Sequence, residues 1–292
     1  MGGGHVVIGI HGLANKPPEE EKAKWWLAAI REGIERNCAS VPAAFPFDFV
    51  YWASLRYAEP LGSDSNLEPY RPAAKAEAFP RYTPEEAGRT SLVGRLYHKL
   101  GWLEHVTGLT PLDDVILEYR LDDLWNYHQD SAFRDAARAR LLACLRGRRA
   151  DRILLAAHSM GSIIAYDCLR ILERTDPDLR VDHFVTMGAP LGLVEVQAEI
   201  AAEHGSVRMP DTALAWTNLT DKADIATVAA VLGDEFSVNA RGAKPRDVPV
   251  INAYRRPDGT PNHHKSYGYL RTPEFSEIVQ AFLAGSGSAP AG

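Results

Sequence analysis

The stretch that decides the fold runs from Arg152 to Tyr166 and reads RILLAAHSMGSIIAY. Its first part, Ile153–Ala157, is a short apolar run of the kind that forms a strand buried on both faces. A helix-length apolar segment begins at Met160, only three residues after that run ends. A strand that passes so abruptly into a helix needs a sharp turn, with small residues two before and two after the central Ser159. Ala157 and Gly161 meet this requirement, so we predict a strand, a tight turn and a helix here.

Similar apolar runs alternate with helical segments along most of the chain. This alternation is typical of a mostly parallel sheet with helices on both faces, because parallel strands need crossover connections. The predicted strands are His5–Ile10, Phe47–Trp52, Arg152–Ala157, Val181–Met187, Ala213–Thr220 and Val248–Tyr254. The predicted helices are one after Pro18, Ser131–Arg146, Met160–Arg174, Leu193–His204, Asp224–Leu232 and one beginning at Thr272-Pro273. The expected fold class is therefore α/β.

The segment from about 54 to 130 interrupts this alternation. A structureless loop of that length is uncommon in a compact domain, and Thr83-Pro84-Glu85-Glu86 has the pattern of a helix N-terminus. We predict an inserted cap at 54–130 within one domain covering 1–284, followed by a flexible tail at 285–292. Four aromatic residues of the insertion could line an acyl pocket or pack the insertion itself, namely Trp102, Tyr119, Trp125 and Tyr127.

Composition excludes several classes of partner. Lys plus Arg total 32 against 38 for Asp plus Glu, a net charge of −6, and binding to a nucleic-acid backbone needs clustered basic residues. The N-terminus lacks the pattern of a signal peptide, and no apolar segment is long enough to span a membrane. Cys38, Cys144 and Cys168 have no metal-binding spacing and are interpreted as buried thiols. We expect a cytoplasmic protein that needs no cofactor or metal, with its oligomeric state left open.

The serine of the central motif has two interpretations. A serine at this place could simply cap the helix that begins at Met160. The position between a buried strand and a buried helix favours a different role, because such a turn lifts the serine hydroxyl clear of the sheet edge. The free N–H groups at the start of the helix would also favour negative charge there. We therefore predict that Ser159 is a nucleophile.

A second signal lies at the end of the first predicted strand, which reads Ile10-His11-Gly12-Leu13-Ala14. Attack of a serine on an acyl group creates an oxyanion that two N–H groups must stabilise. One donor is expected to be Met160, directly after the nucleophile, and the other to come from this early loop. Leu13 is the preferred second donor and Ala14 is the alternative. Taken alone, His11-Gly12 would be an ordinary turn at a strand end.

A nucleophilic serine needs a histidine base and a carboxylate that orients it. The expected chain order is serine, acid, histidine, on loops after later strands. Two acids, Asp221 and Asp224, follow the strand that ends at Thr220, and His263 and His264 follow the last predicted strand. Position in the chain leaves both choices open. Asp224 could also cap a helix, and the histidine pair could be solvated, while metal binding is disfavoured because no further ligand pattern accompanies it.

Together these segments resemble the lipase and esterase branch of the α/β-hydrolase superfamily. The resemblance is carried by His11-Gly12, Ala157–Gly161, Asn218 with Asp224, and His264-Lys265-Ser266-Tyr267, and by the turn Gly188–Leu191. It favours Asp224 over Asp221 and His264 over His263. It covers Val6 to Phe282 except the insertion. Two departures from the superfamily are that the first strand pair is missing and that the insertion precedes the nucleophile strand.

The resemblance implies a serine hydrolase that cleaves a carboxylic ester of a small molecule through an acyl-enzyme on Ser159. Asp224 and His264 would complete the triad, and Leu13 with Met160 would form the oxyanion hole. Two alternatives stay open at this point. The same residues could serve an acyltransferase or a thioesterase, or the fold could be a catalytically silent binding protein. A peptidase or amidase is open as well, although no sequence feature speaks for it.

Overall fold

The structure is a computed structural model. It describes residues 3–40, 44–62, 66, 69–73, 77–83, 123, 124, 126–227 and 231–285. Of the predicted helix start at Thr83–Glu86, residues 84–86 lie outside these residues, as do most of the insertion and the predicted tail beyond Gly285. The aromatics Trp102, Tyr119 and Trp125 lie outside them too.

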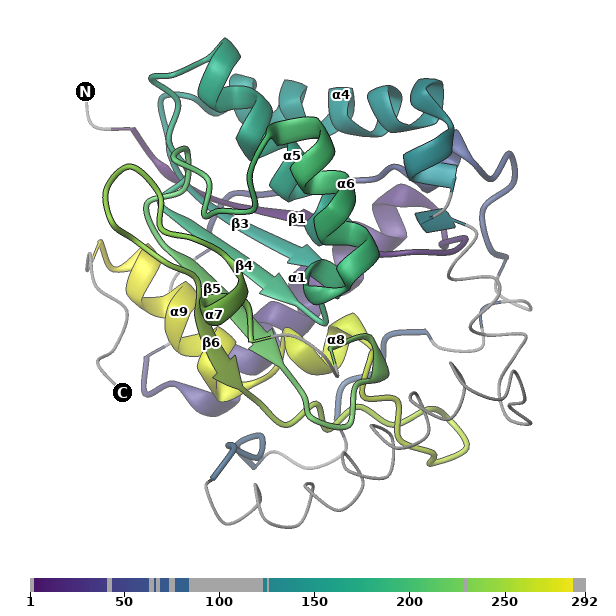
Figure 1. Cartoon of the computed structure of the whole chain (residues 1–292). Helices are drawn as coiled ribbons and strands as arrows, with labels where there is room; N and C mark the ends of the chain where they lie inside the picture. Colours follow the sequence, from purple (N-terminus) through teal and green to yellow (C-terminus); the bar gives the residue numbers. More distant parts are fainter. Residues whose placement is uncertain are drawn as a thin grey trace, which may run out of the picture.

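A six-stranded sheet forms the centre of the molecule (Figure 1). Its strands are β1 (His5–Ile10), β2 (Phe47–Val50), β3 (Arg152–His158), β4 (His183–Met187), β5 (Trp216–Thr220) and β6 (Arg246–Pro249), in the spatial order β2-β1-β3-β4-β5-β6. Every adjacent pair is parallel. The structure therefore confirms the predicted α/β fold. Since all six strands run the same way, their carboxyl ends meet at one edge of the sheet.

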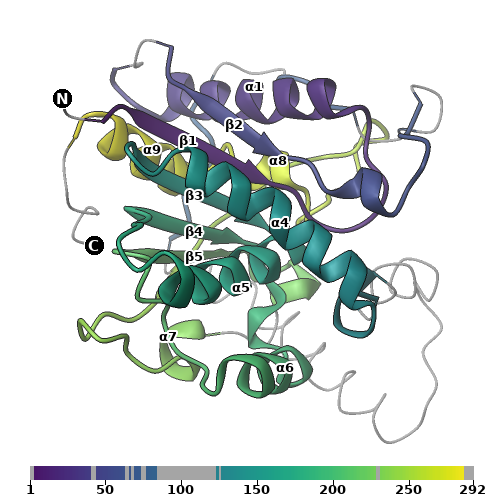
Figure 2. The same ribbon diagram turned by 90° about the horizontal axis from the view of Figure 1, so that it is seen from above.

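Helices cover both faces of the sheet (Figure 2). On one face lie α4 (Ser131–Gly147) and α5 (Met160–Thr175), with α6 (Val194–His204) beside them. On the other lie α1 (Glu19–Asn37) and α9 (Pro273–Leu283). Successive side chains of β3 divide between the two faces: Ile153 and Leu155 pack in the α4–α5 core, whereas Leu154 packs in the α1–α9 core. This alternation follows from the two-residue period of a strand and explains why β3 is apolar throughout.

The predicted last strand, Val248–Tyr254, begins and ends earlier than expected. Strand β6 covers Arg246–Pro249, and the N–H of Val250 still donates to Thr220 O at 2.9 Å. Two residues later the N–H of Asn252 donates to the Asp221 carboxylate at 2.6 Å instead. The backbone leaves the sheet here because a buried carboxylate competes successfully for its donor.

The helix predicted at Asp224–Leu232 does not form at residues 224–227 or at residue 231, which belong to its described part. A 3-10 turn, η3, covers Ile225–Thr227, and a short helix, α7, covers Leu232–Glu235. The Asp224 carboxylate accepts the N–H of Ala226 at 3.0 Å, and the Thr227 hydroxyl donates to the carbonyls of Asp221 and Asp224. Side-chain bonds of this kind satisfy backbone groups that a regular helix would otherwise pair.

A buried polar network joins α4, α5 and α6. The Asp167 carboxylate accepts hydrogen bonds from Tyr127 Oη (2.6 Å), Arg138 Nη2 (2.6 Å) and His204 Nε2 (3.0 Å), and Arg138 also pairs with Glu203. These bonds hold the pKa of Asp167 below its usual value despite its burial. Tyr127 therefore has neither role considered for the insertion's aromatics: it does not line the cavity at Ser159, and it packs in the core of the main domain. Among the described residues, no helix is both long and apolar enough to cross a membrane.

Candidate active site

Ser159 lies at the junction of β3 and α5, at the carboxyl edge of the sheet. Its backbone has φ 54° and ψ −130°, a conformation that costs a residue with a side chain of order 1–3 kcal/mol. The N–H of Ser159 is held by Met187 O at 2.9 Å. A Cβ on Gly161 would lie 2.6 Å from His11 O, and a Cβ on Gly12 would lie 2.5 Å from the Ser159 Cβ. Both glycines are therefore required by the close approach of the chain segments around the turn.

The structure brings Asp224 and His264 to Ser159. His264 Nε2 is 3.0 Å from Ser159 Oγ, and His264 Nδ1 is 2.9 Å from both carboxylate oxygens of Asp224. The other two candidates form a neighbouring pair, in which His263 Nδ1 is 3.4 Å from Asp221 Oδ2. A continuous chain of hydrogen bonds therefore runs from a buried carboxylate through an imidazole to the serine hydroxyl.

Asp224 is fully buried and well supplied with donors. It accepts from His264, from the N–H of Ala226 at 3.0 Å and from Tyr269 Oη at 2.7 Å. Burial and the adjoining Asp224 charge raise the pKa of Tyr269 well above its usual value, so the phenol keeps its proton and acts as a donor. The same phenol oxygen accepts the N–H of Asp221 at 3.1 Å. Three donors therefore satisfy the oxygens of the buried Asp224 carboxylate, which would be very costly to leave unpaired.

The backbone around His264 is held on both sides by side chains. Asn252 Nδ2 donates to the carbonyls of His263 (2.7 Å) and Lys265 (2.9 Å), and His158 Nε2 donates to the carbonyl of His264 (2.7 Å). Burial lowers the pKa of His158 well below its usual value, and His264 lowers it further, so the ring is neutral with its proton assigned to Nε2. Three consecutive carbonyls are thereby fixed, and with them the direction of the imidazole.

Sequence reasoning missed the supporting roles of Asn252 and Tyr269. The one available signal for Asn252 was an amide inside the apolar run Val250–Tyr254. A buried amide must be hydrogen-bonded, so it marks a place where the chain needs donors. Nothing in the sequence distinguishes Tyr269 from other buried tyrosines.

The loop after β1 presents the predicted oxyanion donors. The N–H of Ala14 is occupied, since it donates to Asp123 Oδ2 at 2.8 Å, and Ala14 has φ 70°. Among the described residues, the N–H groups of Leu13 and Met160 have no hydrogen-bond partner. Of the two candidates for the second donor, the geometry favours Leu13 over Ala14. Lys16 Nζ donates to the carbonyls of Leu13 and Ala14 and so fixes the same loop.

His11 supports this loop. Its Nδ1 donates to Gly12 O at 2.8 Å, its Nε2 accepts the N–H of Trp52 at 3.0 Å, and its ring stacks on Trp52 with centroids 4.7 Å apart. Burial lowers the pKa of His11 well below its usual value, and the charge of Lys16 lowers it further. Both ring nitrogens are used, so His11 is a neutral structural residue.

Ser159 and His264 open onto a cavity of about 700 Å³. The loop after β1, the start of α1 and the segment 256–267 form its walls, and Leu61 and Asn66 of the predicted insertion contribute to them. Gly188, with φ +56°, lies next to the Asp224–His264 pair. A Cβ there would lie 2.8 Å from Asp224 Oδ2 and 3.1 Å from His264 Nδ1. The pair therefore fits only because position 188 has no side chain.

Comparisons with known proteins add little to this geometry. No family model matches the chain, and no curated protein matches it. A "putative cell surface hydrolase" from Lactobacillus plantarum WCFS1 is similar in structure, with 8% identity and a TM-score of 0.39, over 98% of this chain and 93% of that one. A cutinase-like protein from Cryptococcus sp. has 11% identity and a TM-score of 0.37, over 99% and 97% of the two chains. Likenesses this weak assign no activity, so the functional conclusion depends on the site itself.

Proposed function

We propose that the protein is a serine hydrolase that cleaves a carboxylic ester through an acyl-enzyme on Ser159. The observation that carries the proposal is the chain of hydrogen bonds from Asp224 through His264 to Ser159, at 2.9 and 3.0 Å. A nucleophile, a base and an orienting carboxylate at these distances meet the geometric requirement for acyl transfer. The strained backbone at Ser159 supports the same interpretation, because such strain is concentrated at functional sites.

In the proposed mechanism, Ser159 Oγ attacks the acyl carbon while His264 Nε2 takes the hydroxyl proton. Asp224 holds the Nδ1–H and offsets the positive charge of the imidazolium. The N–H groups of Leu13 and Met160 donate to the oxyanion, and losing one such donor costs about 3 kcal/mol of transition-state stabilisation. His264 then protonates the leaving alcohol, and water activated by His264 releases the acid from Ser159.

The proposal includes the organisation of the chain. A single domain at 1–284 carries the site, and the insertion at 54–130 contributes to substrate selection. Leu61 and Asn66, which line the cavity, support this role for the insertion.

The test is covalent labelling with a fluorophosphonate followed by peptide mass spectrometry. We expect an adduct on Ser159 in the wild type and none in Ser159→Ala. Asp224→Asn should label more slowly and lose about 10⁴-fold in kcat, because the amide favours the wrong tautomer of His264. Ser162→Ala is the matched control, since Ser162 lies in the same motif but its hydroxyl donates to Ala157 O at 3.1 Å. An unlabelled Ser159 in folded wild-type protein would contradict the proposal, as would ester turnover by Ser159→Ala at the wild-type rate.

A further inference from the structure

We propose that Asp123 is a positioning residue for the oxyanion hole: its carboxylate holds the loop after β1 in the conformation that presents the N–H of Leu13 to the substrate. This inference rests on the hydrolase function proposed above and deepens it. Asp123 belongs to the insertion predicted at 54–130, so stabilisation of the transition state would depend on that insertion. The inference comes from the contacts that one buried carboxylate makes with the loop.

The loop after β1 has a backbone conformation that needs support. Ala14, directly after the proposed donor Leu13, has φ 70°, which residues with a side chain rarely adopt. Such a conformation persists only where the surrounding structure holds it in place. Glycine would adopt it freely, but position 14 is an alanine. Bonds to neighbouring groups must therefore stabilise this turn.

Two consecutive peptide groups set the direction of the Leu13 N–H, and each is held by a side chain. The first joins Gly12 to Leu13, and its carbonyl accepts a hydrogen bond from His11 Nδ1 at 2.8 Å. The second joins Leu13 to Ala14, and its N–H donates to Asp123 Oδ2 at 2.8 Å. Because a peptide group is planar, holding one of its polar atoms restricts the whole group. His11 therefore fixes the backbone on one side of Leu13, and Asp123 fixes it on the other.

The carboxylate of Asp123 is itself held by two side chains. The residue is only 1% exposed. Tyr57 Oη donates to its two carboxylate oxygens, at 3.2 and 3.1 Å, and Arg56 Nε lies 3.5 Å from Oδ1. These two donors come from the start of the predicted insertion, whereas Asp123 lies near its end. A buried carboxylate is costly to leave unpaired, so these bonds set its position relative to Ala14.

The insertion also holds the loop farther from Leu13. The N–H of Leu61 donates to Lys16 O at 2.8 Å, in the part of the loop that leads to α1. The bond from Ala14 to Asp123 is nearer in the chain to the proposed donor. Removing it should therefore loosen Leu13 while the far end of the loop stays attached.

The kinetic test uses two variants of Asp123 and hydrolysis of 4-nitrophenyl butyrate. Asp123→Ala should lower kcat about 100-fold with KM little changed, because loss of one oxyanion donor acts on the transition state. The pH profile of kcat should keep its shape, since the bonds from Asp224 through His264 to Ser159 are untouched. Asp123→Asn keeps one acceptor for the Ala14 N–H, so it should lose only about tenfold. It also serves in place of Asp123→Ala if that variant does not fold.

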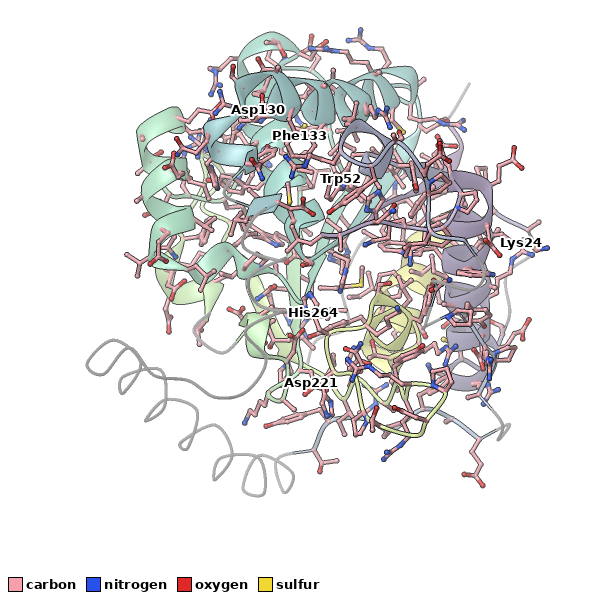
Figure 3. All side chains as sticks on the ribbon, turned by 90° about the vertical axis from the view of Figure 1, so that its right-hand side faces the viewer. Lys24, Trp52, Asp130, Phe133, Asp221 and His264 are labelled. Atoms are coloured by element: carbon pink, nitrogen blue, oxygen red, sulfur yellow. The ribbon has the colours of Figure 1, made fainter. Side chains whose placement is uncertain are left out.

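Asp130→Ala is the matched control, because Asp130 belongs to the same segment of the chain. Its carboxylate accepts the N–H of Phe133 at 3.1 Å at the start of α4. There the ring of Phe133 packs on Trp52 with centroids 5.8 Å apart, away from His264 (Figure 3). The variant should weaken the start of α4 and leave kcat unchanged. At equal fractions folded, wild-type kcat in the Asp123 variants, or an equal loss in Asp130→Ala, would overturn the inference.

Hydrogen exchange of single backbone amides, measured by NMR, separates this inference from the proposed function because it needs no turnover. The Ala14 amide should exchange about tenfold faster in Asp123→Ala than in the wild type, and at the wild-type rate in Asp130→Ala. Faster exchange at Ala14 supports the positioning role even if Ser159 proves unreactive. An exchange rate at Ala14 that is equal in the wild type and in Asp123→Ala overturns this role even if the wild type hydrolyses esters.

Discussion

Replacing Asn252 with alanine should disable the histidine base without touching any reacting atom. Asn252 is 1% exposed, and its amide holds the carbonyls on both sides of His264. It is closely packed, since a Cβ on Gly268 would lie 1.5 Å from Asn252 Oδ1. Removing the amide therefore frees the carbonyls of His263 and Lys265 together.

The expected magnitude follows from those two bonds. Each lost hydrogen bond costs about 1 kcal/mol, and a buried carbonyl left unpaired adds to this, so the free energy of unfolding should fall by about 3 kcal/mol. The catalytic loss has a different origin. A loop that shifts the imidazole by about 1 Å costs on the order of 100-fold in rate. We therefore expect kcat/KM to fall about 100-fold in protein that is still folded.

The assay measures hydrolysis of 4-nitrophenyl butyrate beside urea unfolding. Asn239→Ala is the matched control, because Asn239 is equally buried but its side chain accepts the N–H groups of Arg241 and Ala243 in a turn away from Ser159. Asn252→Asp keeps the volume but cannot donate, so it should lose activity as Asn252→Ala does. If Asn252→Ala and Asn239→Ala, at equal fractions folded, lose kcat/KM equally, the positioning role of Asn252 is refuted.

Two further predictions concern position 188 and pH. Gly188→Ala should lower kcat at least 100-fold, because its Cβ would press on Asp224 Oδ2 at 2.8 Å. Gly205→Ala has a similar φ of +76° with open space around it, so it should cost about 1 kcal/mol of stability and no activity; equal activity of the two variants would contradict this reasoning. The stability of the fold should decrease below about pH 6.5, the ordinary pKa of an unfolded histidine. Burial lowers the pKa of His183 to about 4 in the folded state, and His158 is shifted in the same direction. Unfolding therefore takes up protons between about pH 6.5 and 4, and stability is lost as pH falls through that window. Urea unfolding at pH 5 and 7 measures this loss, which His183→Gln should reduce by about 2 kcal/mol; an equal loss in wild type and variant would exclude His183 as a cause.

Local sequence was sufficient to predict the strand, turn and helix around Ser159. Each of these depends on residues that are neighbours in the chain: a continuous apolar run, and small residues flanking the serine. Prediction failed where a side chain, distant or local, competed for hydrogen bonds of the backbone. The Asp221 carboxylate takes the N–H of Asn252, which ends the last strand early, and Asp224 with Thr227 replaces a helix by a 3-10 turn.

The candidate site also has a part that the sequence predicts and a part that depends on the folded chain. Chain order alone placed an acid and a histidine after Ser159 but left Asp221 or Asp224, and His263 or His264, as equal choices. Residues one to three positions apart carry the same local pattern, so only the family resemblance favoured Asp224 and His264. In the folded chain His264 reaches Ser159, whereas His263 lies beside Asp221.

By itself, then, the sequence determined the parallel α/β sheet and the turn that presents Ser159, because short-range periodicity and side-chain size control both. Position in the chain left the acid and the histidine open, the family resemblance favoured Asp224 and His264, and the tertiary structure joins this pair to Ser159 by hydrogen bonds. It also decided that Asn252 holds the backbone on both sides of His264. Lys22 and Lys265, which are 243 positions apart in the sequence, both lie close to the ring of Tyr267 for the same reason. The physical reason is that these contacts join segments far apart in sequence, whose distances are set when the strands pack side by side and bring their carboxyl ends to one edge.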